Sequence, residues 1–131
     1  MSDAVSVRGV VVAHGAMAQG MVDAVRCIAG GAADALEPLS NNGKSPVELK
    51  EDLDAVAGEG PVLVFVDLQR GSCGMAALSC CKDKARRVVV SGVNLPMLLD
   101  FVFHKDLPME ELVARSVNKG RAAIDRPLIP G

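Results

Sequence analysis

Hydrophobic and polar positions follow two different patterns along this chain. Mostly apolar runs extend from Val5 to Val12, from Pro61 to Val66 and from Arg86 to Ser91, and a shorter one covers Leu36 to Leu39. Runs of this kind are typical of strands that are covered on both faces. Between the runs, apolar residues recur at every third or fourth position, which indicates amphipathic helices. The sequence therefore predicts four strands that alternate with helices.

Glycine, proline and capping residues set the expected ends of the first two helices. The first helix carries apolar residues from Met17 to Ala29 and is expected to stop at the Gly30-Gly31 pair. The segment Ser45-Pro46-Val47-Glu48 combines a Ser N-cap, a Pro at the first helical position and the Glu of a capping box. We therefore expect a second helix to begin there and to end near Gly58.

Three further helices are expected in the second half of the chain. A Gly-Ser-Cys-Gly turn at positions 71–74 leads into a helix that runs to about Cys81. The next helix shows the full pattern of one apolar face, with Leu95, Leu98, Leu99, Val102 and Phe103. The last helix begins near Pro108 and is expected to bury Met109, Leu112, Val113 and Val117.

Repeated strand–helix alternation implies right-handed crossovers in a parallel sheet. We therefore predict an α/β fold, with a doubly wound, four-stranded, mainly parallel sheet of order 2-1-3-4 and helices on both faces. The sequence contains no internal repeat, low-complexity tract or interdomain linker. Residues 1–131 are accordingly expected to form a single domain.

Composition and charge restrict the function further. The 131 residues are 50% hydrophobic, which argues against a disordered chain, and their net charge is only −2. Nucleic acid is an unsuitable partner because the chain lacks Trp, Tyr and a basic excess. The longest apolar runs are far below the roughly 18 residues of a membrane span, and the N-terminus lacks the basic start of a signal peptide. We expect a cytoplasmic protein, not inserted in a membrane, with four reduced and mostly buried cysteines.

The predicted strand order indicates where on the sheet a ligand would bind. Ligands of open parallel sheets bind beyond the carboxyl ends of the strands, where the connections leave toward opposite faces. In the predicted order this point lies between the first strand, which His14 follows, and the third strand, which ends at Asp67. A carboxylate that accepts the proton of one imidazole nitrogen leaves the other nitrogen as a nucleophile. Such a pair serves acyl transfer, metal binding or phosphoryl transfer.

Other residues distinguish these three chemistries. A metal site is disfavoured because His104, the other histidine, lies at the end of a predicted helix. A Ser–His–Asp hydrolase is disfavoured because the chain has no G-x-S-x-G elbow. Gly71 and Ser72 open a predicted helix, whose N-terminus and free backbone N–H groups favour an anion. Phosphoryl transfer is therefore the preferred chemistry.

Three stretches of the chain resemble one known family. They are Val10-Val-Val-Ala-His-Gly15, then Val64-Phe-Val-Asp-Leu68 with Gly71-Ser72, and Val90-Ser-Gly-Val-Asn-Leu-Pro-Met-Leu-Leu99. In this order and spacing they resemble the mannose-family EIIA domain of the bacterial phosphoenolpyruvate-dependent sugar phosphotransferase system. The third stretch is the most specific of the three. The resemblance covers nearly the whole chain, from about residue 7 to residue 124.

The resemblance implies a phosphoryl carrier. It makes His14 the residue that HPr phosphorylates, Asp67 its orienting partner, and Gly71 and Ser72 the phosphate-binding turn. The phosphate then passes to an EIIB protein during sugar uptake, and no cofactor or metal is needed. Members of the family are usually homodimers. Two alternatives share the fold: a regulatory protein whose phosphorylation state is sensed without transport, and the phosphodonor subunit of dihydroxyacetone kinase.

Some positions depart from the family pattern. Arg70 stands where a small residue is usual, and we expect it to pair with phosphate or to cover the site. Cys73 replaces a usual proline, and we interpret it as a buried thiol. Met17 and Met21 are candidates for a docking face, although their helical spacing favours the core. Prolines 127 and 130 near the end of the sequence argue against a swapped terminal strand.

Overall fold

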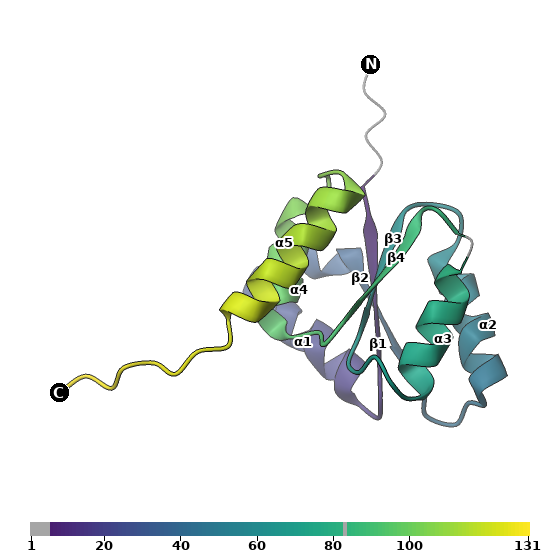
Figure 1. The fold of residues 1–131 in the computed structure, drawn as a ribbon, viewed down its shortest axis with the longest axis horizontal. Coiled ribbons are helices and arrows are strands. Elements are labelled where there is room, and N and C mark those ends of the chain that lie inside the picture. The colour runs from purple at the N-terminus through teal and green to yellow at the C-terminus, as the bar shows by residue number, and fades with distance from the viewer. Residues whose placement is uncertain (1–5, 83) are drawn as a thin grey trace, which may run out of the picture.

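A four-stranded sheet lies at the centre of the protein (Figure 1). The computed structural model describes residues 6–82 and 84–131, so the predicted strand start at Val5 lies outside the described residues. The strands are β1 (Arg8–Ala13), β2 (Leu36–Ser40), β3 (Val62–Val66) and β4 (Arg87–Ser91). The helices are α1 (Met17–Ala29), α2 (Pro46–Ala57), α3 (Ser72–Cys81), α4 (Leu95–His104) and α5 (Met109–Ala122), with a 3-10 helix at Gly30–Ala35.

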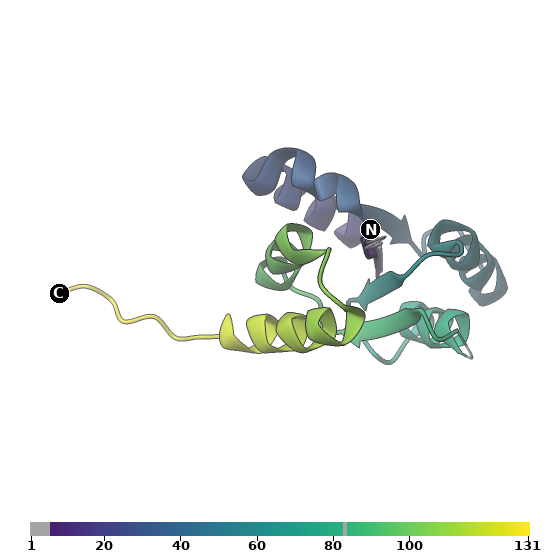
Figure 2. The same cartoon turned by 90° about the horizontal axis from the view of Figure 1, so that it is seen from above.

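The sheet has the predicted topology. Its order is β2-β1-β3-β4 and every neighbouring pair is parallel. Helices α1, α4 and α5 cover one face, and α2 and α3 cover the other (Figure 2). The connection from β1 to β2 therefore runs over one face and the connection from β3 to β4 over the opposite face. This reversal between β1 and β3 creates the crevice at which ligands of such sheets bind.

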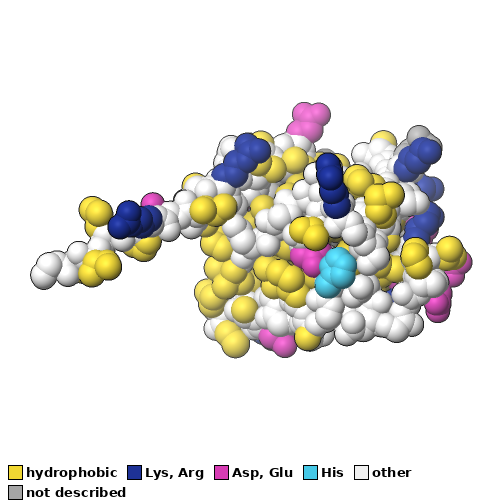
Figure 3. Space-filling view, turned by 60° about the horizontal axis from the view of Figure 1, so that its bottom comes forward, with side chains coloured by type: hydrophobic (Ala, Val, Ile, Leu, Met, Phe, Trp, Pro, Cys, Tyr) yellow, Lys and Arg dark blue, Asp and Glu magenta, His cyan; other side chains and the backbone are white. Residues whose placement is uncertain are grey.

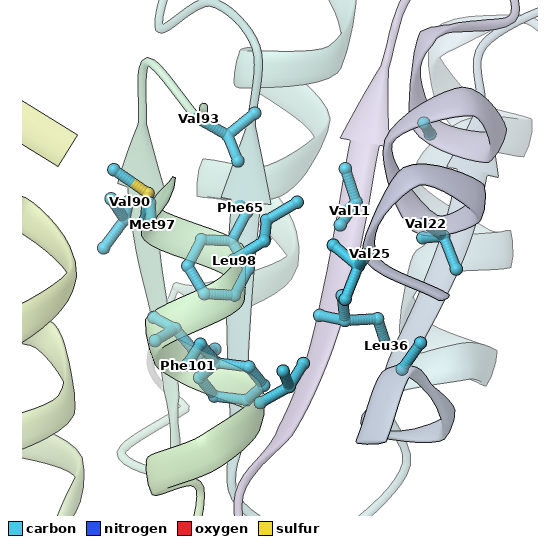
Figure 4. Close-up of a cluster of buried hydrophobic side chains, with 14 of the residues drawn as sticks. Val11, Val22, Val25, Leu36, Phe65, Val90, Val93, Met97, Leu98 and Phe101 are labelled. Atoms are coloured by element: carbon cyan, nitrogen blue, oxygen red, sulfur yellow. The ribbon is translucent and has the colours of Figure 1, made fainter. Parts of the chain in front are cut away.

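Two hydrophobic cores hold the helices against the sheet. All five residues of β3 are buried, and alternate side chains point to opposite faces, which explains the uninterrupted apolar run. On the α1/α4 face, Phe65 meets Phe101 edge to face, with ring centroids 5.2 Å apart (Figure 4). Gly9 makes room here, because a Cβ on it would lie 2.7 Å from Leu36 Cδ2 and 2.8 Å from Phe101 Cε2.

Local capping explains why the predicted helix ends are accurate. Ser45 and Glu48 form a complete capping box at the start of α2, and Gly58 is its C-cap. Gly30, with φ of +60°, ends α1 as predicted. The burial predicted for α5 is correct only in part, because Leu112 is buried while Met109, Val113 and Val117 are half-buried. All three pack against the core, and Val113 and Val117 also line an open hollow between β4 and α5.

One arginine joins the elements on the α2/α3 face. Arg87 donates to the Asp54 carboxylate and to the carbonyl oxygens of Cys80 and Gly58, all at 2.8–2.9 Å. Burial raises the pKa of Asp54, but hydrogen bonds from Lys50, Cys80 and Arg87 lower it more, so that the pKa lies at about 2. The start of β4 is thereby tied to the ends of α2 and α3.

Gly9→Ala is expected to lower the free energy of unfolding by about 1–3 kcal/mol, because the added methyl group overpacks the site between Leu36 and Phe101. Urea denaturation measures this difference. Gly20→Ala in α1 is the matched control, since nothing lies within 4 Å of its added methyl; it is expected to raise stability by up to about 1 kcal/mol. Equal stability of Gly9→Ala and wild type would contradict the described packing.

Asp54→Asn is expected to destabilise the protein at neutral pH and to have progressively less effect in acid. The pKa of Asp54 in the folded state, about 2, is lower than its ordinary value of 3.8. Its stabilising contribution is therefore complete above the unfolded-state pKa and is lost as the pH falls through the folded-state pKa. Denaturation of both proteins between about pH 7 and pH 2 tests this. A difference in unfolding free energy that stays constant over this range would contradict the assigned ion pair.

Candidate functional site

His14 and Asp67 meet at the carboxyl ends of the two central strands. The register of the sheet pairs Val12 of β1 with Val66 of β3, so the residues that follow these strands emerge side by side. The Asp67 carboxylate accepts two hydrogen bonds through Oδ2: one from the His14 backbone N–H at 3.0 Å and one from His14 Nδ1 at 2.9 Å. The two contacts fix both the position and the rotation of the imidazole ring. The structure thus brings together the pair that the sequence predicted.

The two partners differ in exposure. The Asp67 side chain is only 11% exposed, whereas that of His14 is 43% exposed. Burial raises the pKa of Asp67, but the two hydrogen bonds from His14 and the charge of its ring lower it more, so the pKa lies below its ordinary value. Asp67 is therefore a carboxylate at neutral pH, and its preferred partner at Nδ1 is an N–H group. The lone pair of the neutral ring is then on Nε2, at the exposed edge.

The N-terminus of α3 lies beside this exposed edge. Ser72 Oγ is 3.4 Å from His14 Nε2. Gly71 is the N-cap of α3 and has a φ of +118°, a conformation that favours glycine, and a Cβ on it would lie 3.5 Å from His14 Cε1. The first backbone N–H groups of a helix have no partner within it and carry partial positive charge. The surroundings of Nε2 are therefore suited to an anion.

Gly74 is a structural requirement of this turn that the sequence analysis did not single out. A Cβ on Gly74 would lie 2.1 Å from the carbonyl oxygen of Gln69 and 2.6 Å from that of Leu68. Only a residue without a side chain permits the first turn of α3 to lie so close to the loop after β3. The second glycine of the Gly-Ser-Cys-Gly turn is the sequence feature that could have indicated this requirement.

The loop after β2 forms a third wall that sequence reasoning also missed. Asn41 Oδ1 accepts a hydrogen bond from the Gly15 N–H at 3.2 Å, and Asn41 Nδ2 donates to Ser72 Oγ at 3.4 Å. Ser40 Oγ donates to the Gly15 carbonyl oxygen at 2.7 Å. No local pattern indicates a role for Asn41, because its neighbours are set by the pairing of β2 with β1.

The loop after β3 places its remaining residues at the surface. Arg70 is exposed and forms no ion pair with another described residue. Leu68, 56% exposed, and Met17, 43% exposed, also lie at the surface. The expectation that Met17 belongs to the core is therefore wrong: it is the first residue of α1 and is not among the side chains that pack in the core. Met21, one turn later, is half-buried against the core as expected.

Cys73 adds a thiol to the site, and thiol side chains can bind metal ions. One ligand atom from each of His14, Asp67 and Cys73 lies within 4.8 Å of the others. Burial raises the pKa of the Cys73 thiol, and the negative charge of Asp67 raises it further. A protonated thiol is a poor metal ligand, and the N-terminus of α3 repels cations. The electrostatics of the site favour an anion over a metal ion.

The site is an open surface and not an enclosed cavity. Figure 3 shows a histidine next to an acidic side chain, with hydrophobic side chains on one side of the pair and a Lys or Arg side chain nearby. A separate hollow between β4 and α5 is lined by residues such as Val90, Asn94 and Ile124, away from His14. No helix among the described residues has the length and apolar character needed to cross a membrane. An exposed nucleophile with apolar neighbours is suited to a macromolecular partner.

Three solved structures with the same fold are proteins of bacterial phosphotransferase systems. The mannose/sorbose-specific IIA subunit from Enterococcus faecalis is 24% identical, with a TM-score of 0.86, over 97% of this chain and 98% of that chain. The EIIA component from Streptococcus agalactiae is 22% identical, with a TM-score of 0.84, over 92% and 96%. The IIA protein associated with the fucose utilization operon of Streptococcus pneumoniae is 25% identical, with a TM-score of 0.72, over 93% and 95%. No curated protein matches the chain by sequence.

The family comparison covers most of the chain. The model of the EIIA-man family, described as the PTS system fructose IIA component, matches residues 9–117. The match includes the sheet, the His14–Asp67 pair and the N-terminus of α3. The resemblance inferred from the three sequence stretches is thereby confirmed. The chain belongs to the EIIA-man family and is a IIA component of the sugar phosphotransferase system.

Proposed function

We propose that this protein carries a phosphoryl group on His14, accepting it from HPr and passing it to an EIIB protein during sugar uptake. The observation that carries the proposal is the arrangement of the imidazole ring. Its Nδ1 is held by the buried Asp67 carboxylate, while Nε2 is exposed and faces Ser72 and the start of α3. A nucleophile, its orienting group and an anion-binding helix terminus are thus in one place.

The acceptance step follows from this arrangement. Asp67 accepts the hydrogen bond of Nδ1–H and leaves the lone pair on Nε2. Nε2 attacks the phosphorus of phosphorylated HPr, the P–N bond of the donor breaks, and its electron pair returns to the donor nitrogen. The charge that His14 gains is stabilised by the Asp67 carboxylate. The same steps in reverse, with a nucleophile of EIIB as the acceptor, discharge the carrier.

The phosphate oxygens are held by groups beside Nε2. In our proposal the Ser72 hydroxyl and the first N–H groups of α3 donate to them, and Gly71 leaves room for them. Arg70 is in the same loop, and its guanidinium is free of ion pairs with the described residues. It is suited to a bidentate contact with phosphate in the loaded protein. No metal or organic cofactor takes part in these steps.

The surface around His14 fits partner proteins. Exposed Met17 and Leu68 supply apolar area, and Arg70 supplies charge at its edge. Interfaces of this composition, with an apolar centre and a charged rim, are typical of protein–protein contacts. We infer that HPr and EIIB dock on this face in turn, in the cytoplasm, because both must bring a reactive group to the same Nε2 atom.

We also propose that the protein is a homodimer. Beyond α5 the chain runs away from the rest of the molecule (Figures 1 and 2), and its Leu128 and Ile129 side chains are 95% and 92% exposed. Strand β4 is at the sheet edge, and the hollow beside it is lined by apolar residues of β4 and α5. Segment 125–131 of one copy would cover this hollow on the other. Pro127 and Pro130 restrict it to an extended segment without regular strand pairing.

His14→Ala is expected to abolish phosphorylation. Wild-type protein incubated with phosphoenolpyruvate, enzyme I and HPr should gain one acid-labile phosphate, detected by intact mass spectrometry, because Nε2 is the nucleophile. His104→Ala is the matched control, since His104 lies at the end of α4 and contacts Asp100 and Arg115 instead of the site. It is expected to be phosphorylated like wild type. No phosphorylation of wild type, or phosphorylation of His14→Ala, would refute the carrier proposal.

Discharge separates the transport role from its alternatives. After removal of the donor proteins, phosphorylated protein should lose its phosphate on addition of an EIIB protein. Phosphorylation without discharge to any EIIB would instead favour a regulatory protein, and discharge to dihydroxyacetone kinase would favour the phosphodonor role.

Removal of residues 125–131 is expected to convert the dimer into a monomer, because it removes the apolar segment that covers the partner and leaves Ile124 of the hollow in place. Light scattering after size-exclusion chromatography measures the mass. The double variant Leu128→Ser/Ile129→Ser should weaken the dimer in the same direction. Ile28→Ser is the matched control, because Ile28 is 63% exposed on α1 and outside the proposed interface. A wild-type monomer, or a dimer unaffected by the truncation, would contradict the proposal.

A further inference from the structure

Asn41 joins the three loops that build the site. It follows β2 directly, and because β2 is parallel to β1, with Ser40 paired to Ala13, its side chain lies next to the His14–Gly15 loop. Its amide makes two contacts across long stretches of sequence: Oδ1 accepts from the Gly15 N–H at 3.2 Å, and Nδ2 donates to Ser72 Oγ at 3.4 Å. A single side chain thus connects the loop of the nucleophile to the start of α3.

The contact with Gly15 fixes which way the amide faces. A backbone N–H can only donate, so the atom that faces it is the carbonyl oxygen Oδ1 and the atom that faces Ser72 is the NH₂ group. Asn41 Nδ2 can only donate, so Ser72 Oγ must act as the acceptor of this bond. The hydroxyl proton of Ser72 is therefore directed away from Asn41.

On the open side of the site, the described side chain that faces this hydroxyl is His14, through its Nε2 atom. Ser72 Oγ is 3.4 Å from Nε2 in the structure described here. In the unphosphorylated protein the hydroxyl proton points to the lone pair of Nε2. Once Nε2 carries phosphate, the same proton points to a phosphate oxygen. Asn41 thus determines that Ser72 acts as a donor toward the anion.

The loop after β2 also fixes the backbone that follows the nucleophile. Gly15 has a φ of +61°, so its peptide groups have an orientation that only a few residue types adopt readily. Asn41 binds its N–H group, and Ser40 Oγ, which itself accepts from the Asn42 N–H, binds its carbonyl oxygen. Side chains therefore hold the backbone at both His14 and Gly15. Asp67 accepts from the His14 N–H, while Asn41 and Ser40 bind the N–H and the carbonyl oxygen of Gly15.

We propose that Asn41 is a positioning residue for phosphoryl transfer, which orients the Ser72 hydroxyl toward the phosphate and fixes the loop of His14. This inference rests on the proposed function in so far as His14 is the phosphate acceptor. It assigns to the loop after β2 a role in selecting an anion, because Asn41 leaves the Ser72 hydroxyl to donate beside the N–H groups at the start of α3.

Asn41→Asp isolates the orienting role. The carboxylate has the size of the amide and still accepts from the Gly15 N–H, but it cannot donate to Ser72 at neutral pH. It accepts the Ser72 proton instead and withdraws that proton from the phosphate. Asn42→Asp is the matched control, because it places the same charge one residue away and leaves the contacts of Asn41 intact. Asn41→Ala, which removes both contacts, is the second variant in case Asn41→Asp folds poorly.

The test uses phosphoramidate, which transfers its phosphoryl group to histidine and releases ammonia, so that no partner protein is needed. The rate of phosphorylation of His14 is followed by ³¹P NMR in wild type, Asn41→Asp, Ser72→Ala and the double variant. We expect Asn41→Asp to be slower by about tenfold or more, the effect of losing one oriented hydrogen bond to an anion, and Asn42→Asp to match wild type. The double variant should be no slower than the slower single variant, because Asn41 acts through Ser72.

The possible outcomes are distinct. A wild-type rate for Asn41→Asp, or effects of the two single variants that multiply in the double variant, would overturn the role of Asn41. An equal loss in Asn42→Asp would overturn it too, since charge alone would then be the cause. Phosphorylation of wild type by phosphoramidate but not by HPr would refute the proposed function and leave the role of Asn41 standing. A merely structural role would lower thermal stability in parallel with the rate, and the isosteric Asn41→Asp should leave stability near that of wild type.

Discussion

The parallel pairing of β1 with β3 is the constraint on which the site depends. It places Val12 opposite Val66, so that His14 and Asp67 leave the sheet at adjacent positions. A shift of this register by one residue would turn the alternating side chains of β3 to the wrong faces, against two separate hydrophobic cores. The packing of both faces therefore maintains the 2.9 Å contact between His14 and Asp67. The packing that stabilises the core therefore also fixes the geometry of the site.

The charged and polar groups of the site are arranged in order from the interior to the surface. The negative group, Asp67, is buried behind the ring, and the donor groups of α3 and Ser72 lie in front of it. An anion that arrives from solvent meets Nε2 and the donors before it meets the carboxylate. Cys73 does not alter this order, because burial raises the pKa of its thiol and keeps it neutral. The shallow, exposed form of the site fits the proposed transfer between two partner proteins.

Sequence patterns were most informative where a single local cause dominates. The capping box of Ser45 and Glu48 and the C-cap at Gly30 act within one or two turns of chain, so the ends of α1 and α2 were predicted closely. Burial at the margin of an element has no such local cause. Met17 follows the helical spacing of its neighbours yet is 43% exposed, and the buried residues of α1 are Ala18, Val22 and Val25. Periodicity shows which side of a helix faces inward but not how far the core extends.

The sequence by itself determined the order of the elements, the mostly apolar central strands and, through them, the proximity of His14 and Asp67. It did so because right-handed crossovers leave few arrangements for four parallel strands. Only the tertiary structure decided the part played by Asn41 and Gly74. Asn41 is 26 and 31 positions away from its two partners, and Gly74 is required by carbonyl oxygens of a loop folded back against its own helix. Contacts of this kind depend on how loops meet after the sheet has formed, and no local pattern in the chain specifies them.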